Sequence, residues 1–131
     1  MAHVLIVDDD DAFREALAEA VSDLGHAASE AASGAAGEAA ILRGGVDAVL
    51  LDLRMPGMDG MELLRRLRAR PDGPPVAIVT AHATAANTIE AMRLGAVDHL
   101  TKPIGGAELR RVLDVLLASR AAAAPPEPPG A

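Results

Sequence analysis

Two groups of acidic residues follow short apolar runs in this sequence. Four acids, Asp8 to Asp11, come directly after Val4 to Val7, and Asp52 comes after Val46 to Leu51. Carboxylates that converge within a few ångströms repel one another at reduced dielectric, so they take up protons unless a cation is present. Because only oxygen ligands are offered, with no cysteine or histidine at ligand spacing, the hard ion Mg2+ fits such a cluster.

Two further polar segments also follow apolar runs. Thr80-Ala81-His82 comes after Val76 to Val79, and Thr101-Lys102-Pro103 comes after Val97 to Leu100. A metal that keeps open water positions can accept a phosphate oxygen, a lysine can balance the charge on transferred oxygens, and a carboxylate can serve as the nucleophile. These residue types therefore indicate phosphoryl transfer, provided that the fold brings them together.

The elements between these segments predict such a fold. Apolar runs of this length are typical of strands covered on both faces, and they alternate with helical patterns of apolar residues. The clearest patterns run through Phe13 to Leu24, Met61 to Leu67, Ile89 to Ala96 and Leu109 to Leu116. Alternation of this kind predicts a parallel sheet with helices on both faces, and the carboxyl ends of such strands meet at one edge.

Two regions carry weaker signals. The Ala-rich segment 26–44 indicates a strand and then a helix, which would complete five strand and helix pairs. After Arg120 the sequence becomes four alanines followed by PPEPPGA, which cannot extend a helix far. We therefore expect one domain over residues 1–120 and a linker or loose tail over 121–131.

Composition limits the classes of function. The net charge is -7 in 131 residues, which argues against direct nucleic-acid binding by this domain. Cysteine is absent, so neither a disulfide framework nor a thiolate metal site can form. The sequence shows neither a signal-peptide pattern nor an apolar run long enough to span a membrane, and we expect a soluble, cytoplasmic protein without a membrane partner.

Four motifs in this order resemble the receiver domain of bacterial two-component response regulators. They are LIVDDDDAFR at 5–14, LLDLRMPGMDG at 50–60, IVTAH at 78–82 and GAVDHLTKPI at 95–104. The resemblance implies an α/β fold, a doubly wound, flavodoxin-like parallel sheet of five strands in the order 2-1-3-4-5 with five helices. The segment from Thr80 to Ile104 is most similar to receivers of NtrC-like regulators, which control sigma-54-dependent transcription.

The resemblance also implies roles for individual residues. Asp52 would be the phosphoacceptor, and Mg2+ would be held by Asp52, by Asp9 directly, by Asp8 through a water and by the backbone carbonyl of Arg54. Thr80 would bond the phosphoryl group through its hydroxyl. Lys102 would pair with another phosphoryl oxygen and would precede a cis peptide bond to Pro103.

The sequence departs from the family at His99, where Tyr or Phe is usual. An imidazole is smaller and can be charged near neutral pH, so the usual aromatic switch is in doubt; a switching role and a merely structural one stay open. Ile104, where Phe is common, is interpreted as a core substitution. We interpret Asp10, Asp11 and Asp59 as helix-capping or helix-preceding acids, Met55-Pro56-Gly57 as a turn, and His82 as a loop residue without a metal role.

The expected function is a phosphorylation switch rather than an enzyme acting on external substrates. Its expected partners are a sensor histidine kinase or phosphotransfer protein and a downstream output domain or effector. We expect this output to be transcriptional. The sequence leaves open whether a homodimer forms on phosphorylation, and whether the receiver stands alone or belongs to a longer regulator. A phosphatase of the haloacid dehalogenase type is disfavoured because Leu53 and Arg54, rather than a second acid, follow Asp52. A flavodoxin-like cofactor binder is disfavoured because four acids after the first strand would repel a phosphate.

Overall fold

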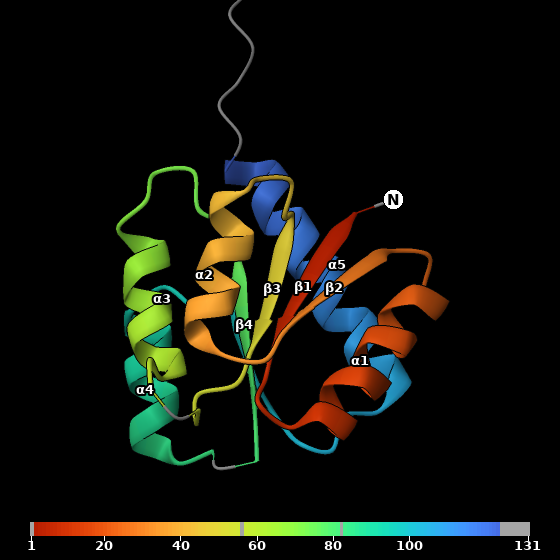
Figure 1. Cartoon of the computed structure of the whole chain (residues 1–131), viewed down its shortest axis with the longest axis horizontal. Coiled ribbons are helices and arrows are strands. Elements are labelled where there is room, and N and C mark those ends of the chain that lie inside the picture. The colour runs from red at the N-terminus through yellow and green to blue at the C-terminus, as the bar shows by residue number, and fades with distance from the viewer. Residues whose placement is uncertain (1, 56, 82, 124–131) are drawn as a thin grey trace, which may run out of the picture.

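The computed structural model describes residues 2–55, 57–81 and 83–123. Strands and helices alternate along this part of the chain (Figure 1). The strands are β1 (His3–Val7), β2 (Ala27–Ala31), β3 (Ala48–Leu51), β4 (Val76–Thr80) and β5 (Asp98–Thr101). The helices are α1 (Asp11–Asp23), α2 (Gly34–Leu42), α3 (Gly60–Arg68), α4 (Ala85–Arg93) and α5 (Gly106–Ala123).

The five strands form one parallel sheet in the order β2-β1-β3-β4-β5. This confirms both the parallel alternation predicted from the apolar runs and the strand order implied by the family resemblance. In Figure 1 the strand arrows point toward the lower edge of the sheet. Residues that follow β1, β3, β4 and β5 are therefore brought to the same edge, although they lie far apart in the sequence.

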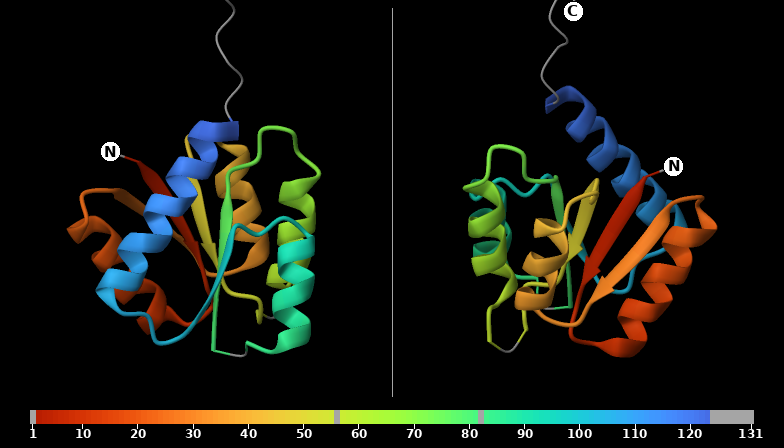
Figure 2. Two further views of the ribbon diagram at one scale, coloured as in Figure 1. Left: turned by 180° about the vertical axis from the view of Figure 1, so that it is seen from behind. Right: turned by 45° about the horizontal axis from the view of Figure 1, so that its top comes forward.

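Helices cover both faces of the sheet (Figure 2). The face covered by α1 and α5 has a core that includes Ile6, Leu50 and Val79, and the face covered by α2, α3 and α4 has one that includes Val7, Leu51 and Ile78. Because β1, β3 and β4 are buried on both faces, their side chains are apolar at nearly every position. The strand ends are therefore covered from both sides.

Polar side chains start four of the helices. Asp10, Ser33, Asp59 and Thr84 each accept a hydrogen bond from the backbone N–H three residues further on. The capping prediction for Asp10 and Asp59 is thereby confirmed. Gly25 lies just after α1 with a φ of 92°. Glycine adopts this left-handed conformation more easily than other residues, and it commonly ends helices.

The boundaries differ in places from those that the apolar patterns predicted. β3 begins at Ala48 rather than Val46, because Val46 is buried by packing without belonging to the strand. Ala96 is buried as well, but α4 ends before it at Arg93, and Gly95 has a φ of 98°. Segment 26–44 forms the expected strand and helix, β2 and α2. Apolar periodicity reports burial, which continues past the ends of an element.

α5 continues to Ala123, three residues past the expected end of the domain at 120, in keeping with the high helix propensity of alanine. The rest of the expected tail, residues 124–131, lies outside the described residues, as do Pro56 of the predicted turn and His82. Among the helices described, none has both the length and the apolar character needed to cross a membrane.

Candidate functional site

Backbone hydrogen bonds place the site residues at the carboxyl edge of the sheet. The N–H of Asp8 donates to Ala31 O of β2 at 3.1 Å, and the N–H of Asp52 donates to Val7 O of β1 at 2.9 Å. The N–H of Lys102 donates to Thr80 O at 3.0 Å. Each residue thus extends the ladder of its own strand by one step, so its side chain leaves from a rigid backbone.

The three acids predicted to share a metal lie together. Asp8, Asp9 and Asp52 each offer a carboxylate oxygen, and these oxygens lie within 4.8 Å of one another. Asp8 and Asp52 are buried, with exposed fractions of 2% and 7%, whereas Asp9 is exposed. The cluster therefore has two carboxylates in the protein interior and one at its mouth.

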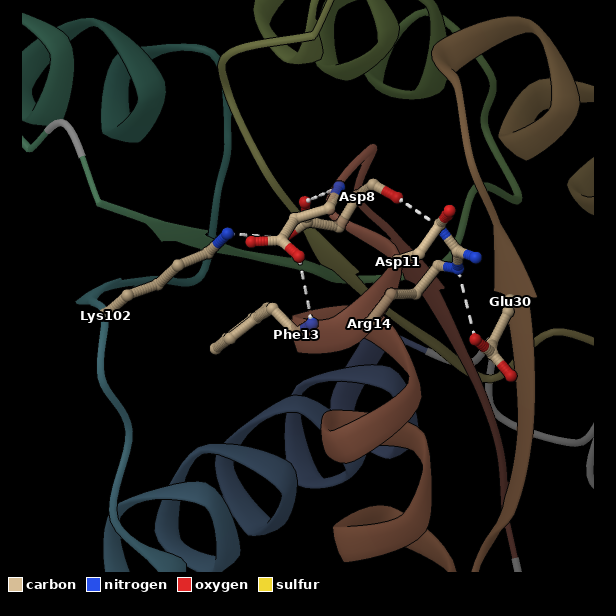
Figure 3. Close-up of polar contacts among 7 residues, drawn as sticks. Asp8, Asp11, Phe13, Arg14, Glu30 and Lys102 are labelled. Atoms are coloured by element: carbon tan, nitrogen blue, oxygen red, sulfur yellow. Dashed lines mark hydrogen bonds and ion pairs between the residues drawn. The ribbon is translucent and has the colours of Figure 1, made fainter.

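Lys102 is the cation nearest to these carboxylates among the described ion pairs. Its Nζ lies 2.6 Å from Asp8 Oδ2 and 3.7 Å from Asp52 Oδ2 (Figure 3 shows the contact with Asp8). The peptide bond from Lys102 to Pro103 is cis, as the resemblance implied. One ammonium thus serves two buried acids that come from β1 and β3.

The surroundings of Asp52 oppose its ionisation. Burial is the largest influence and raises the pKa of the Asp52 carboxyl, and the negative charge of Asp8 raises it further. Lys102, the backbone N–H of Arg54 and the side chain of Thr80 act in the opposite direction without fully compensating. Asp52 is thus an acid whose charged form lacks sufficient positive charge around it.

This donor set fits Mg2+. The clustered ligand atoms are carboxylate oxygens, which are the ligands that this ion prefers, and a cation would supply the positive charge that the buried acids lack. No sulfur or imidazole ligand belongs to the cluster among the described residues. Asp8, Asp9 and Asp52 are the side chains that would hold the ion.

Thr80 and Arg54 border the cluster in different ways. Thr80 is the last residue of β4, is fully buried and makes a side-chain hydrogen bond to Asp52. The backbone N–H of Arg54 lies 3.3 Å from Asp52 Oδ1. The predicted hydroxyl role of Thr80 is compatible with this position, while the carbonyl role of Arg54 stays a prediction.

His99 belongs to a neighbouring region. Its Nε2 lies 3.4 Å from Thr88 Oγ1, so the imidazole of β5 reaches toward α4. Burial lowers the pKa of His99, and the nearby charge of Asp98 opposes that shift. The imidazole is thus biased toward its neutral form in this position, and its switching role stays a prediction.

Two neighbours of the acids were not foreseen from the sequence. Arg14 donates from Nη1 to the backbone carbonyl of Asp8 at 2.9 Å and forms ion pairs with Asp11 and Glu30 (Figure 3). Phe13 places its ring below Lys102, with Nζ 4.0 Å from the ring centroid. The available signal was that Phe13 and Arg14 follow the run of acids with only Ala12 between them.

Comparison with known proteins shows the family of this chain. Residues 4–114 match the family model described as the response regulator receiver domain. The chain is 40% identical over 115 residues to the response regulator protein FleR of Pseudomonas aeruginosa, an alignment covering 88% of this chain and 24% of FleR. It is 37% identical over 122 residues to the transcriptional regulatory protein GlrR of Escherichia coli, covering 93% of this chain and 28% of GlrR.

Solved structures include a similar fold in NtrX from Brucella abortus. The TM-score is 0.85 with 30% identity, and the match covers 93% of this chain and 28% of NtrX. This chain thus spans only about a quarter of the length of FleR or GlrR. The chain belongs to the response regulator receiver domains of two-component signalling, in the style of the receivers of NtrC-like regulators.

Proposed function

We propose that this receiver is a Mg2+-dependent phosphoacceptor whose phosphorylated residue is Asp52. Phosphoacceptor switching, rather than turnover of an external substrate, is the general role of its family. The observation that carries the assignment is the position of Asp52, a buried carboxylate beside Asp8, with one lysine within 3.7 Å of it. The other two acids of the cluster differ, because Asp8 is already bonded to Lys102 and Asp9 is exposed.

The reaction is an in-line transfer of a phosphoryl group. A carboxylate oxygen of Asp52 attacks phosphorus, a P–O bond forms, and the P–N bond to a phosphohistidine of the sensor kinase or phosphotransfer protein breaks. The electron pair of that bond stays on the imidazole, which takes a proton from solvent. Acetyl phosphate would react in the same way, with acetate as the leaving group.

Residues around Asp52 would bind the metal ion and the oxygens of the transferred phosphoryl group. Mg2+ would supply positive charge toward the transferred oxygens, held by Asp52, by Asp9, by Asp8 through a water and by the carbonyl of Arg54. Lys102 would turn from Asp8 toward one phosphoryl oxygen. The Thr80 hydroxyl, now bonded to Asp52, would donate to another.

The output of the switch would pass through β5 and α4. Movement of Thr80 toward the phosphoryl group would be felt by its neighbour Thr101 in β5, and the contact of His99 with Thr88 connects β5 to α4. A modest bias between two packings is sufficient for such a switch. The α4, β5 and α5 surface would then meet the output partner or a second copy of the receiver.

We infer that the output is transcriptional, because FleR and GlrR are longer regulators and GlrR is named a transcriptional regulatory protein. The acidic receiver, with a net charge of -7, would not contact nucleic acid itself. Residues 1–120, together with the end of α5 up to Ala123, would form the receiver, and the rest of segment 121–131 a linker or loose tail. The partners would act in the cytoplasm.

The test is to incubate the protein with acetyl phosphate and MgCl2 and to measure its intact mass. We expect one phosphoryl group to be added in the presence of Mg2+, and none when EDTA replaces it. Asp52→Asn should remain unmodified. Asp59→Asn is the matched control, because this exposed acid caps α3 and asparagine caps as well as aspartate. Equal modification of the wild type and Asp52→Asn would refute the proposal.

A further inference from the structure

The only lysine of the sequence lies against its only aromatic residue. Lys102 Nζ is 4.0 Å from the centroid of the Phe13 ring, and the lysine side chain is only 13% exposed. An ammonium within about 6 Å of a ring centroid is attracted by the electron-rich face of the ring, and this attraction strengthens as water is excluded. Lys102 is thus held by two carboxylates and by one uncharged group.

The ring is fixed by the same loop that carries the acids. Asp8 Oδ1 accepts from the N–H of Asp10 at 2.9 Å, and Asp10 Oδ1 accepts from the N–H of Phe13 at 3.1 Å. Lys102 then closes a circuit of contacts by bonding Asp8 Oδ2 at 2.6 Å (Figure 3). Phe13 is half-buried against the core under α1 and α5, so its position follows from the start of α1.

The contacts of Lys102 with the carboxylates and with the Phe13 ring respond differently when a metal ion or a phosphoryl group enters the site. The carboxylates of Asp8 and Asp52 would be shared with a metal ion or a phosphoryl group, which weakens their attraction for the ammonium. The face of Phe13 offers no lone pair for a metal and does not titrate. It therefore keeps its attraction for Lys102 in every state of the site. Lysine has a flexible four-carbon stem, so a contact of this kind limits the positions that it samples.

We propose that Phe13 is a positioning residue for Lys102, keeping the ammonium beside Asp52 while the acids exchange partners. This inference rests on the proposed function, because its benefit is faster phosphoryl transfer to Asp52. A purely structural role for Phe13 is the alternative, in which the ring only fills space beside the core. The two accounts differ in whether the electrons of the ring matter.

The first test varies those electrons at nearly constant shape. Because Phe13 is the only phenylalanine, growth on 4-fluoro-, 3,5-difluoro- or 3,4,5-trifluorophenylalanine modifies this position alone. Fluorine withdraws electron density from the ring face and weakens its attraction for a cation. We expect the rate of phosphorylation by acetyl phosphate to fall stepwise with fluorination, and about 2- to 10-fold in Phe13→Leu. Phe13→Tyr should retain the wild-type rate.

Leu24→Ala is the matched control for lost packing, because Leu24 lies at the other end of α1 and is half-buried against the same core. It should lower the melting temperature and leave the phosphorylation rate unchanged. A rate that follows the melting temperature across all of these variants, or that ignores fluorination, would assign Phe13 a structural role only.

The second test needs no phosphodonor, so it separates this inference from the proposed function. Lysine labelled with 13C and 15N gives the NMR signals of Lys102 alone. An ammonium over a ring face should show an upfield ring-current shift of its Nζ and Cε protons, present in the wild type and lost in Phe13→Leu. If the shift is present but no phosphoryl group is gained, the proposed function fails, while the contact that holds Lys102 over the Phe13 ring stands. If Phe13→Leu leaves these signals unmoved, the positioning inference is wrong.

Discussion

The two ends of the sheet both carry acidic side chains with nearby donors, but the ratio of acids to donors differs between them. At the amino end, His3 donates its backbone N–H to Asp47 at 2.8 Å and its Nδ1 lies 3.0 Å from Gly45 O, while Arg120 lies 3.5 Å from Asp47. One acid there has two donors. At the carboxyl end, three acids gather around one lysine. Strand ends expose polar groups at both edges, but among the described ion pairs and acidic clusters the acids outnumber the cations only at the carboxyl edge.

Burial separates the two ends further. The side chain of Asp47 is 36% exposed, whereas those of Asp8 and Asp52 are 3% and 9% exposed. Water screens charges at the amino end, so these contacts contribute little to stability. At the carboxyl end the excess charge is retained in the interior, which stabilises the binding of a cation at the expense of the metal-free fold. An unbalanced, buried cluster therefore distinguishes the site from ordinary strand-end polarity.

The largest expected effect comes from the backbone that supports the carboxyl end. A Cβ at Gly60 would lie 2.1 Å from Asp52 O and 2.7 Å from Leu53 Cα, so Gly60→Ala must displace the segment that carries Asp52. We expect the free energy of unfolding to fall by about 3 kcal/mol, measured by urea denaturation. Gly106→Ala is the control: a Cβ there meets nothing within 4 Å, and stability should be unchanged or slightly higher. Equal effects of the two substitutions would contradict this view of the Asp52 loop.

The second-largest effect is expected from removing Lys102, the ammonium that Asp8 and Asp52 share. Lys102→Met keeps the apolar stem but leaves Asp8 and Asp52 without their shared ammonium. At pH 7 with EDTA we expect the free energy of unfolding to fall by about 2 kcal/mol, and the rate of phosphorylation by acetyl phosphate to fall at least about tenfold. An unchanged phosphorylation rate would remove Lys102 from the proposed mechanism.

Removing the charge of Asp52 should have a smaller effect than removing Lys102, and it should raise rather than lower the stability of the metal-free protein. Burial and then Asp8 raise the folded-state pKa of Asp52 above its ordinary value of 3.8, so the folded protein retains this proton at pH values where the unfolded chain has lost it. This contribution to stability is fully present below pH 3.8 and is lost as the pH rises through the raised pKa. Asp52→Asn cannot ionise, so without metal it should be more stable than the wild type at pH 7, by about 1 kcal/mol.

This gain in Asp52→Asn should shrink as the pH falls toward 3.8, because the wild-type carboxyl then becomes neutral as well. Urea denaturation of both proteins across this pH range, with EDTA present, provides the measurement. A stability difference that stays constant over this pH range would mean that ionisation of Asp52 does not destabilise the metal-free protein.

The smallest expected effect lies at the amino end. Arg120→Ala removes an ion pair whose side chains are 43% and 36% exposed. We expect the free energy of unfolding to change by no more than about 0.5 kcal/mol and the phosphorylation rate to stay the same. A loss as large as that of Lys102→Met would show that the two ends do not differ as described.

The sequence predicts the convergence of the site better than its details. Apolar runs that alternate with helical patterns place Asp8, Asp52, Thr80 and Lys102 at one edge, because parallel strands share their direction. The strand order came from the resemblance of four motifs and not from periodicity, which carries no information about which strands are neighbours. Boundaries such as Val46 and Ala96 were misplaced because burial extends past the elements.

Contacts that depend on side-chain direction could not be predicted. The ring of Phe13 belongs to the apolar pattern of α1, and only the angle at which α1 leaves β1 brings it to Lys102. Arg14 reaches the carbonyl of Asp8 for the same reason. His99 fits the strand pattern whichever way it points, and its contact with Thr88 depends on the packing of α4 against β5.

The most direct measurement identifies the carboxylate that becomes phosphorylated. After reaction with acetyl phosphate and Mg2+, borohydride reduces an aspartyl phosphate to homoserine, which peptide mass spectrometry can locate. We predict homoserine at position 52 and unmodified aspartate at positions 8, 9 and 10. Homoserine at one of those other positions, or none at 52 in protein that has gained a phosphoryl group, would contradict the assignment of Asp52 as the phosphoacceptor.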